Sequence, residues 1–174
     1  MVPHPYKNQN LVFNHIGISV KSVDKAADRH SKPFGFRRIT NDASADRSTD
    51  GSDSPLFRVY GDKLQKVKIA FLATGNGVGF KIFEFIDPPV RDAEEIKKEW
   101  SIEQQYQRGG YFHIAVTAPD PDAVAEKAFE DGAVRVGETI ELFDGDKALY
   151  LRDQWGNAVE VLSWSLEQMM GNRG

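Results

Sequence analysis

The sequence predicts an α+β fold made of two similar modules, and three observations support this. The segment 13–20 alternates apolar residues with small or polar ones, as a half-buried strand does, and the segment 111–117 repeats the pattern. An offset of 98 residues carries His15 onto His113 and Asp24 onto Asp122. Each half then continues with a predicted helix and further strands in the same order. The chain therefore reads as an internal duplication.

In the first half, a short helix at 24–30 follows the opening strand, and Ser22 is its expected N-cap. Further strands are predicted at 36–40, 56–60, 67–73 and 78–86. The stretch 41–55 is rich in Asp, Ser and Ala and shows no periodicity. We interpret it as a loop insertion, either a mobile lid over a site or a plain surface loop.

In the second half, a helix is expected at 122–130, with strands at 133–136, 139–143, 148–152 and 158–163. The charged stretch that joins the halves is helix-prone and is interpreted as a linker helix. The predicted organisation is an N-terminal tail (1–10), a first module (11–90) with a loop insertion (41–55), a linker helix (91–110), a second module (111–164) and a C-terminal tail (165–174). The C-terminal tail is expected to fray.

Composition narrows the class of protein. The 174 residues are 40% hydrophobic and 28% charged, which suits one compact domain or two packed modules. The net charge of -4, without a basic stripe, argues against a nucleic-acid partner. No apolar run approaches the length of a membrane span, so we expect a cytoplasmic protein. Because there is no cysteine, any metal must be held by nitrogen and oxygen atoms.

Four residues stand out as candidate metal ligands. His15 and His113 lie among small residues on one face of their strands, and Glu84 and Glu160 sit inside apolar strands that end the two halves. A carboxylate in such a strand needs a charged partner or a cation. Taken singly, each histidine is more often an ordinary strand residue, and each glutamate more often pairs with a lysine or arginine. Their repetition favours one shared divalent ion instead, with Zn, Ni, Co, Mn and Fe(II) as candidates.

Three segments, 14–18, 112–116 and 153–160, resemble the vicinal oxygen chelate superfamily, which includes glyoxalase I, extradiol dioxygenases and bleomycin-resistance proteins. The resemblance implies paired βαββ modules whose curved mixed sheets enclose a metal cup. It also implies that His15, Glu84, His113 and Glu160 are the ligands. Superfamily members often complete the cup across a dimer interface, so a homodimer is expected.

The resemblance implies a metal that chelates neighbouring oxygens of a small organic substrate and stabilises an enolate-like intermediate, as in lyases and isomerases of the glyoxalase type. Glu160 or Glu84 would then be the catalytic base. Two alternatives remain open: a ring-cleaving dioxygenase of the extradiol type, and a metal-free protein that binds or sequesters small molecules.

Strand parity also gives an expectation for the aromatic residues of the predicted strand at 78–86. Phe80 and Ile82 share the face of Glu84 and are candidates for the wall of a pocket. Phe83 and Phe85 lie on the other face and are expected to pack under the helices.

Overall fold

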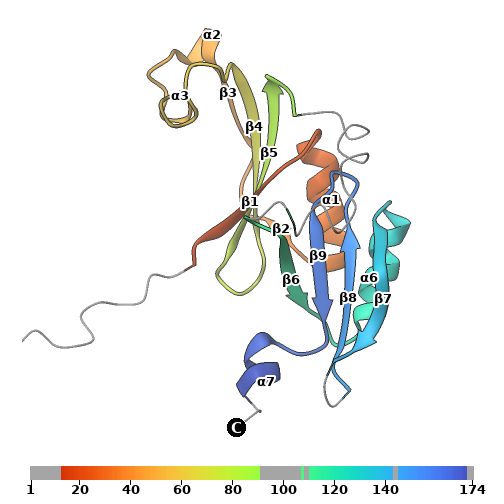
Figure 1. The fold of residues 1–174 in the computed structure, drawn as a ribbon. Coiled ribbons are helices and arrows are strands. Elements are labelled where there is room, and N and C mark those ends of the chain that lie inside the picture. Colours follow the sequence, from red (N-terminus) through yellow and green to blue (C-terminus); the bar gives the residue numbers. More distant parts are fainter. Residues whose placement is uncertain (1–12, 91–106, 108–109, 143–144, 172–174) are drawn as a thin grey trace, which may run out of the picture.

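The computed structural model describes residues 13–90, 107, 110–142 and 145–171, and the chain forms two modules of one plan there (Figure 1). The elements of the first module are β1 (His15–Ser19), α1 (Val23–Phe34), β2 (Arg37–Arg38), β3 (Ala43–Asp46), α2 (Arg47–Asp50), α3 (Pro55–Tyr60), β4 (Lys66–Ala73) and β5 (Gly79–Asp87). Those of the second are β6 (His113–Thr117), α6 (Pro121–Glu130), β7 (Val134–Glu141), β8 (Lys147–Arg152) and β9 (Ala158–Leu162), followed by α7 (Leu166–Gly171). The predicted α+β fold of paired modules is confirmed.

The two sheets have the same strand order. It is β1-β5-β4-β2 in the first module, with β3 also paired to β4, and β6-β9-β8-β7 in the second. In each sheet the first strand runs parallel to the last, and the remaining strands are antiparallel. This shared topology makes the duplication visible, and it allows each residue of one module to be matched with one of the other.

Both principal helices begin with the same arrangement. The side chains of Ser22 and Asp120 cap α1 and α6 by accepting hydrogen bonds from backbone N–H groups. In the first turn of each helix an aspartate pairs with a lysine of the neighbouring sheet: Asp24 with Lys68 at 2.9 Å, and Asp122 with Lys147 at 3.3 Å. Carboxylates at these positions also complement the helix dipole.

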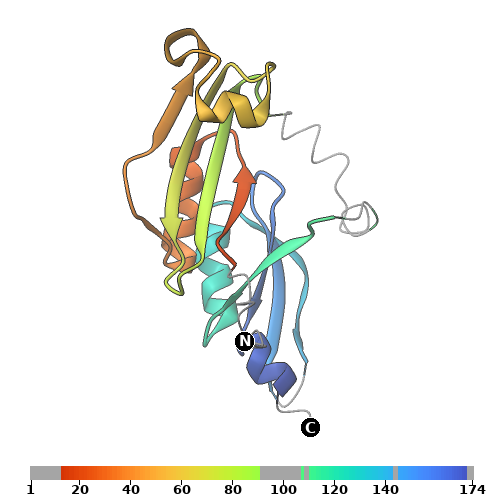
Figure 2. The ribbon, with the colours of Figure 1, turned by 90° about the vertical axis from the view of Figure 1, so that its left-hand side faces the viewer.

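A single hydrophobic core spans both modules. Helices α1 and α6 pack against each other, and each also covers one face of its own sheet. Residues on that inner face of β5 and β9, such as Phe80, Ile82 and Val159, are fully buried. The other face of each sheet, here called its open face, is turned away from this core. Figure 2 views the open face of the first module, with α1 behind the sheet and α3 in front of it.

Several local expectations are corrected. The stretch 41–55 is not a plain loop, because it contains β3 and α2. The predicted strand at 56–60 is the helix α3, which Pro55 starts at its first turn and which buries Phe57. The two strands expected at 133–143 form one strand, β7, with an irregular register between Val136 and Ile140. The stretch expected to fray contains α7.

The predicted N-terminal tail and nearly all of the predicted linker helix fall outside the described residues. Within the described ranges, no helix has both the length and the apolar character needed to cross a membrane.

Candidate metal and ligand site

The open face of the second module brings together the side chains of His113, Tyr150 and Glu160. Strands β6 and β9 pair with Ala115 opposite Glu160, so that His113 and Glu160 project from the same face. The Nε2 atom of His113 lies 3.2 Å from Oε2 of Glu160. Tyr150 of β8 is opposite Glu160 in the register, and its ring meets the His113 ring edge-on with the centroids 5.3 Å apart.

The Glu160 carboxylate interacts with both of the other side chains, His113 and Tyr150. Burial, together with a hydrogen bond donated to Glu160, raises the pKa of the Tyr150 phenol. The phenol therefore remains protonated at neutral pH and holds the Glu160 carboxylate in place. The other ring nitrogen of His113, Nδ1, is buried and has no hydrogen-bond partner among the described residues.

His15 occupies the position in the first module that His113 occupies in the second. It is exposed on β1, and its Nδ1 atom is 2.6 Å from Oδ1 of Asn14. Because an amide oxygen can only accept, Nδ1 is the donor in this contact, and the neutral tautomer that donates from Nδ1 has its lone pair on Nε2. Metal-binding histidines are commonly oriented by such a bond. Gly79, the partner of His15 in the register, gives the side chain room, because a Cβ there would lie 3.1 Å from the Cβ of His15.

The structure corrects the placement of Glu84. This residue lies on the inner face of β5 together with Phe80 and Ile82, and not on the open face with His15. Its Oε2 atom accepts a hydrogen bond of 2.9 Å from the backbone N–H of Val23, the first residue of α1. The carboxylate therefore satisfies a free helix N–H and complements the helix dipole. This contact explains why a glutamate occurs within an apolar strand.

The residue that corresponds to Glu160 in the first module is Lys81. In the registers, Lys81 is opposite Gly17, just as Glu160 is opposite Ala115. Lys81 and Glu84 are three residues apart, an odd number, so their side chains lie on opposite faces of β5. Sequence reasoning missed Lys81. The available signal was the small residue two positions earlier in each strand, Gly79 in β5 and Ala158 in β9.

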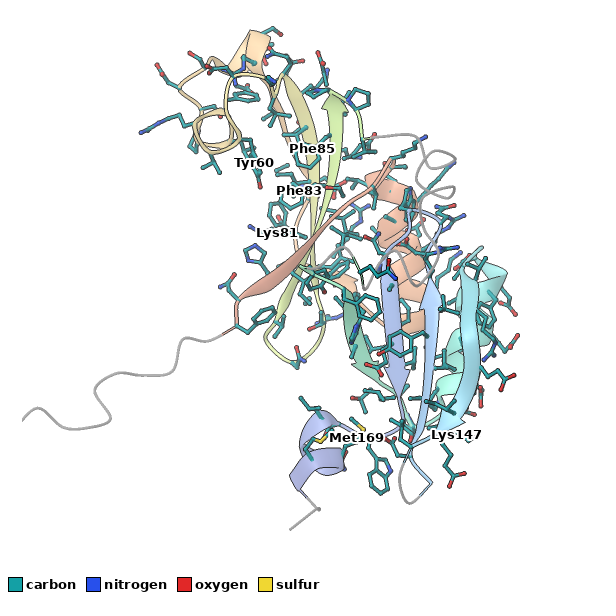
Figure 3. All side chains as sticks on the ribbon, viewed as in Figure 1. Tyr60, Lys81, Phe83, Phe85, Lys147 and Met169 are labelled. Atoms are coloured by element: carbon teal, nitrogen blue, oxygen red, sulfur yellow. The ribbon has the colours of Figure 1, made fainter. Side chains whose placement is uncertain are left out.

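The aromatic residues of β5 are also reversed relative to expectation. Phe83 and Phe85 lie on the open face, with their rings stacked at 5.7 Å, whereas Phe80 and Ile82 pack under α1. Tyr60 of α3 contacts both open-face rings edge-on, at 6.2 Å and 5.9 Å between centroids. Figure 3 shows Tyr60, Lys81, Phe83 and Phe85 on the same side of the first sheet.

The residues fit a metal ion in part. No group of three or more His, Cys, Asp or Glu side chains suited to a metal ion forms among the described residues, so one chain does not bring His15 or Glu84 to the His113–Glu160 pair. The separation of 3.2 Å between the His113 and Glu160 donor atoms does suit two adjacent ligands, since bonds of about 2.0–2.2 Å at right angles place donors about 3 Å apart. Lys81, a cation, does not suit a ligand position.

Comparison with known proteins identifies the family. The sequence profile of the glyoxalase/bleomycin resistance protein/dioxygenase superfamily matches residues 12–161. The chain therefore belongs to this family, the vicinal oxygen chelate superfamily. No curated protein matches the sequence at a significant level.

Solved structures share the fold at low sequence identity. A glyoxalase family protein from Bacillus cereus is 22% identical, with a TM-score of 0.70, over 90% of this chain and 95% of that one. Glyoxalase I from Zea mays is 15% identical, with a TM-score of 0.57, over 88% of this chain and 44% of that one. A glyoxylase/bleomycin resistance protein/dioxygenase domain from Frankia sp. EAN1pec is 16% identical, with a TM-score of 0.54, over 85% of this chain and 93% of that one.

Proposed function

We propose that the protein is a metal-dependent enzyme acting on a small organic molecule, with a site completed by a second copy of the chain. The observation that carries the proposal is the His113–Glu160 pair, whose donor atoms are 3.2 Å apart on an open face. In the homodimer, the open face of the second module in one copy faces the open face of the first module in the other copy.

The metal would be held by His113 and Glu160 of one copy and His15 of the second. This set of two histidines and one carboxylate suits divalent Zn, Ni, Co, Mn or Fe(II). A metal so bound supplies Lewis acidity to oxygen atoms of the substrate. The hydrogen bond between Asn14 and His15 supports the proposal, since it leaves Nε2 of His15 available.

The residues of the chain then have separate roles. Glu160 is the candidate base for a proton on a carbon next to a carbonyl, and Tyr150 orients it through its hydrogen bond. Glu84, which caps α1, is not part of this chemistry. This arrangement supports a lyase or isomerase reaction of the glyoxalase type.

A second candidate is a ring-cleaving dioxygenase of the extradiol type. The observation in its favour is that Lys81, not a carboxylate, corresponds to Glu160. Three protein ligands leave more open positions on a metal than four, as in the two-histidine, one-carboxylate centres of non-haem Fe(II) oxygenases. Anaerobic and aerobic incubation of the Fe(II)-loaded protein with catechols distinguishes the two reactions, because only the dioxygenase consumes oxygen.

The metal site is tested by calorimetric titration of the five ions into the wild type and the variants His15→Ala, His113→Ala and Glu160→Gln. We expect at least one ion to bind the wild type tighter than about millimolar and each variant at least about tenfold more weakly. Glu130→Gln, on the exposed side of α6, is the matched control and should bind like the wild type. Equal binding by wild type and ligand variants would replace the enzyme with a metal-free binding protein.

The assembly is tested by mixing two inactive variants. If the ligands come from two copies, a dimer of His15→Ala with His113→Ala contains one intact site, and unfolding and refolding the mixture should restore about a quarter of the wild-type sites. Light scattering should give about twice the chain mass of 19.5 kDa. A mass of one chain, or a mixture that restores no site, would contradict the shared site.

A further inference from the structure

The two modules carry opposite charges at one matched point of their open faces, on β5 and β9. Strand β9 presents the carboxylate of Glu160 on its open face, and β5 presents the ammonium of Lys81 at the corresponding point of the register. The neighbouring positions are small in both modules, with Gly17 opposite Lys81 and Ala115 opposite Glu160. The duplication has therefore kept the geometry of this position and inverted its charge.

The ammonium of Lys81 has no carboxylate within ion-pair distance among the described residues. Its Nζ atom lies over the face of the Phe71 ring, 5.6 Å from the ring centroid. Other lysines of the same sheet are paired: Lys66 with Asp46 at 3.0 Å, and Lys68 with Asp24 at 2.9 Å. Within the described ranges, Lys81 is thus a cation on the open face that no carboxylate neutralises.

Aromatic rings adjoin this cation. Phe83 and Phe85 stack with an interplanar angle of 8°. Tyr60 meets both rings at an edge and is itself 46% exposed. The rings and Lys81 lie on the side of the sheet away from α1 (Figure 3). A flat apolar group can pack against such rings, and a carboxylate attached to it can accept a charge-assisted hydrogen bond from the ammonium.

We propose that Lys81 is the anion-recognition residue of the site and that its ligand is a carboxylate attached to an aromatic or flat apolar body. The inference rests on the shared site of the proposed function, but it does not depend on the metal. In the dimer, the carboxylate end of the ligand meets Lys81 of one copy, and the remainder of the ligand approaches the His113–Glu160 pair of the other. A closed site excludes water and strengthens the attraction between the two charges.

The inference is tested with matched ligand pairs and the full-length protein freed of metal by EDTA. Calorimetry compares 2-naphthoate with 2-naphthamide and 4-phenylbutyrate with 4-phenylbutyramide, so that each pair differs in charge and little in shape. We expect at least one carboxylate to bind about tenfold or more tightly than its amide, in line with a hydrogen bond between charged groups. Lys81→Met should abolish this preference, and Lys81→Arg should retain most of it.

Lys127→Met, which removes an exposed lysine from α6, is the control and should keep the preference of the wild type. Circular dichroism of each variant verifies that it is folded. If no carboxylate is preferred over its amide, or if Lys81→Met keeps the preference, the inference is overturned even where metal binding is intact. A Lys81→Met protein that loses only dimer affinity also overturns it, because Lys81 would then pair with Glu160 of a second copy. Carboxylate preference without metal binding would support the inference and end the metalloenzyme proposal.

Discussion

The two modules agree where they contact the shared core and differ on their open faces. At the core, both use a capped helix, an aspartate–lysine pair in its first turn and a parallel pairing of first and last strands. On the open faces, β5 carries Lys81 and stacked aromatic rings, whereas β9 carries Glu160 beside His113. Repetition in this chain therefore preserves what holds the fold together and leaves the site free to diverge.

The modules also differ in the helices that, among the described residues, have no counterpart in the other module, α3 and α7. In the first module, α3 lies over the open face and contributes Phe57 and Leu56 to a small cluster with Phe83 and Phe85. In the second, α7 follows the last strand and carries Met169 (Figure 3). This side chain is buried in a cluster with Ala148 and Leu162. Each module thus gains a separate cover for one end of its open face, from a different place in the chain.

The largest expected difference between the modules concerns a matched pair of core residues. Phe80 and Val159 occupy equivalent positions opposite Ile16 and Ile114, and both are fully buried. We expect Phe80→Ala to lower the free energy of unfolding by about 3–5 kcal/mol, because it leaves a large cavity among ring contacts, and Val159→Ala by about 2 kcal/mol. Urea denaturation measures both. A greater loss of stability for Val159→Ala would contradict the expectation that the loss increases with the volume of the side chain removed.

The next expected effect separates Glu84 from Glu160. Glu84→Ala removes the acceptor of the Val23 N–H and should lower the free energy of unfolding by about 0.5–2 kcal/mol, as loss of a helix cap does. Affinity for divalent ions should remain that of the wild type, in contrast to Glu160→Gln. The same denaturation and calorimetry experiments measure the two quantities. Loss of metal binding in Glu84→Ala would return this residue to the site.

The smallest expected effect is a pH dependence shared by both modules. A hydrogen bond from Lys68 lowers the pKa of Asp24, and hydrogen bonds from Thr139 and then Lys147 lower that of Asp122, against an ordinary value of 3.8. Since the pKa is depressed in the folded state, each carboxylate stabilises the fold above about pH 4, and this contribution is lost as the pH falls through the folded-state pKa.

Replacing either aspartate by asparagine should therefore cost about 0.2–1 kcal/mol near neutral pH, the range for exposed ion pairs. The deficit should shrink toward zero as urea unfolding is followed from about pH 7 to about pH 3. Both variants should show this loss of the deficit at low pH, because the pKa of each aspartate is lowered in the folded state. If the deficit in the free energy of unfolding does not change with pH, the loss of stability comes from altered packing and not from the lost charge.

Much of the site followed from local pattern. His113 and Glu160 could be placed on one face because strand side chains alternate at a period of two. The second module also has no insertion like the one in the first, so its strands follow one another at the expected spacing. Glu84 was misplaced because the segment between β2 and β4 contains β3, α2 and α3. The described part of the second module has no counterpart of these elements, so the residue of β5 that matches Glu160 could not be found by counting along the sequence. The prediction chose Glu84 where the structure has Lys81, three residues earlier. Because three is an odd number, this error assigned each side chain of β5 to the wrong face of the sheet.

The sequence alone determined the duplication, the Ser22 cap of the first helix, the family and the identity of His15, His113 and Glu160 as candidate ligands. Each of these depends on spacing within a single element or on a repeated motif. Only the tertiary structure decided that Glu84 caps α1, that Lys81 takes the matching position on the open face, and that His15 does not reach His113 within one chain. The physical reason is that these outcomes depend on strand register and on the packing of α1 against α6. Both are contacts between residues far apart in the chain, which no local periodicity encodes.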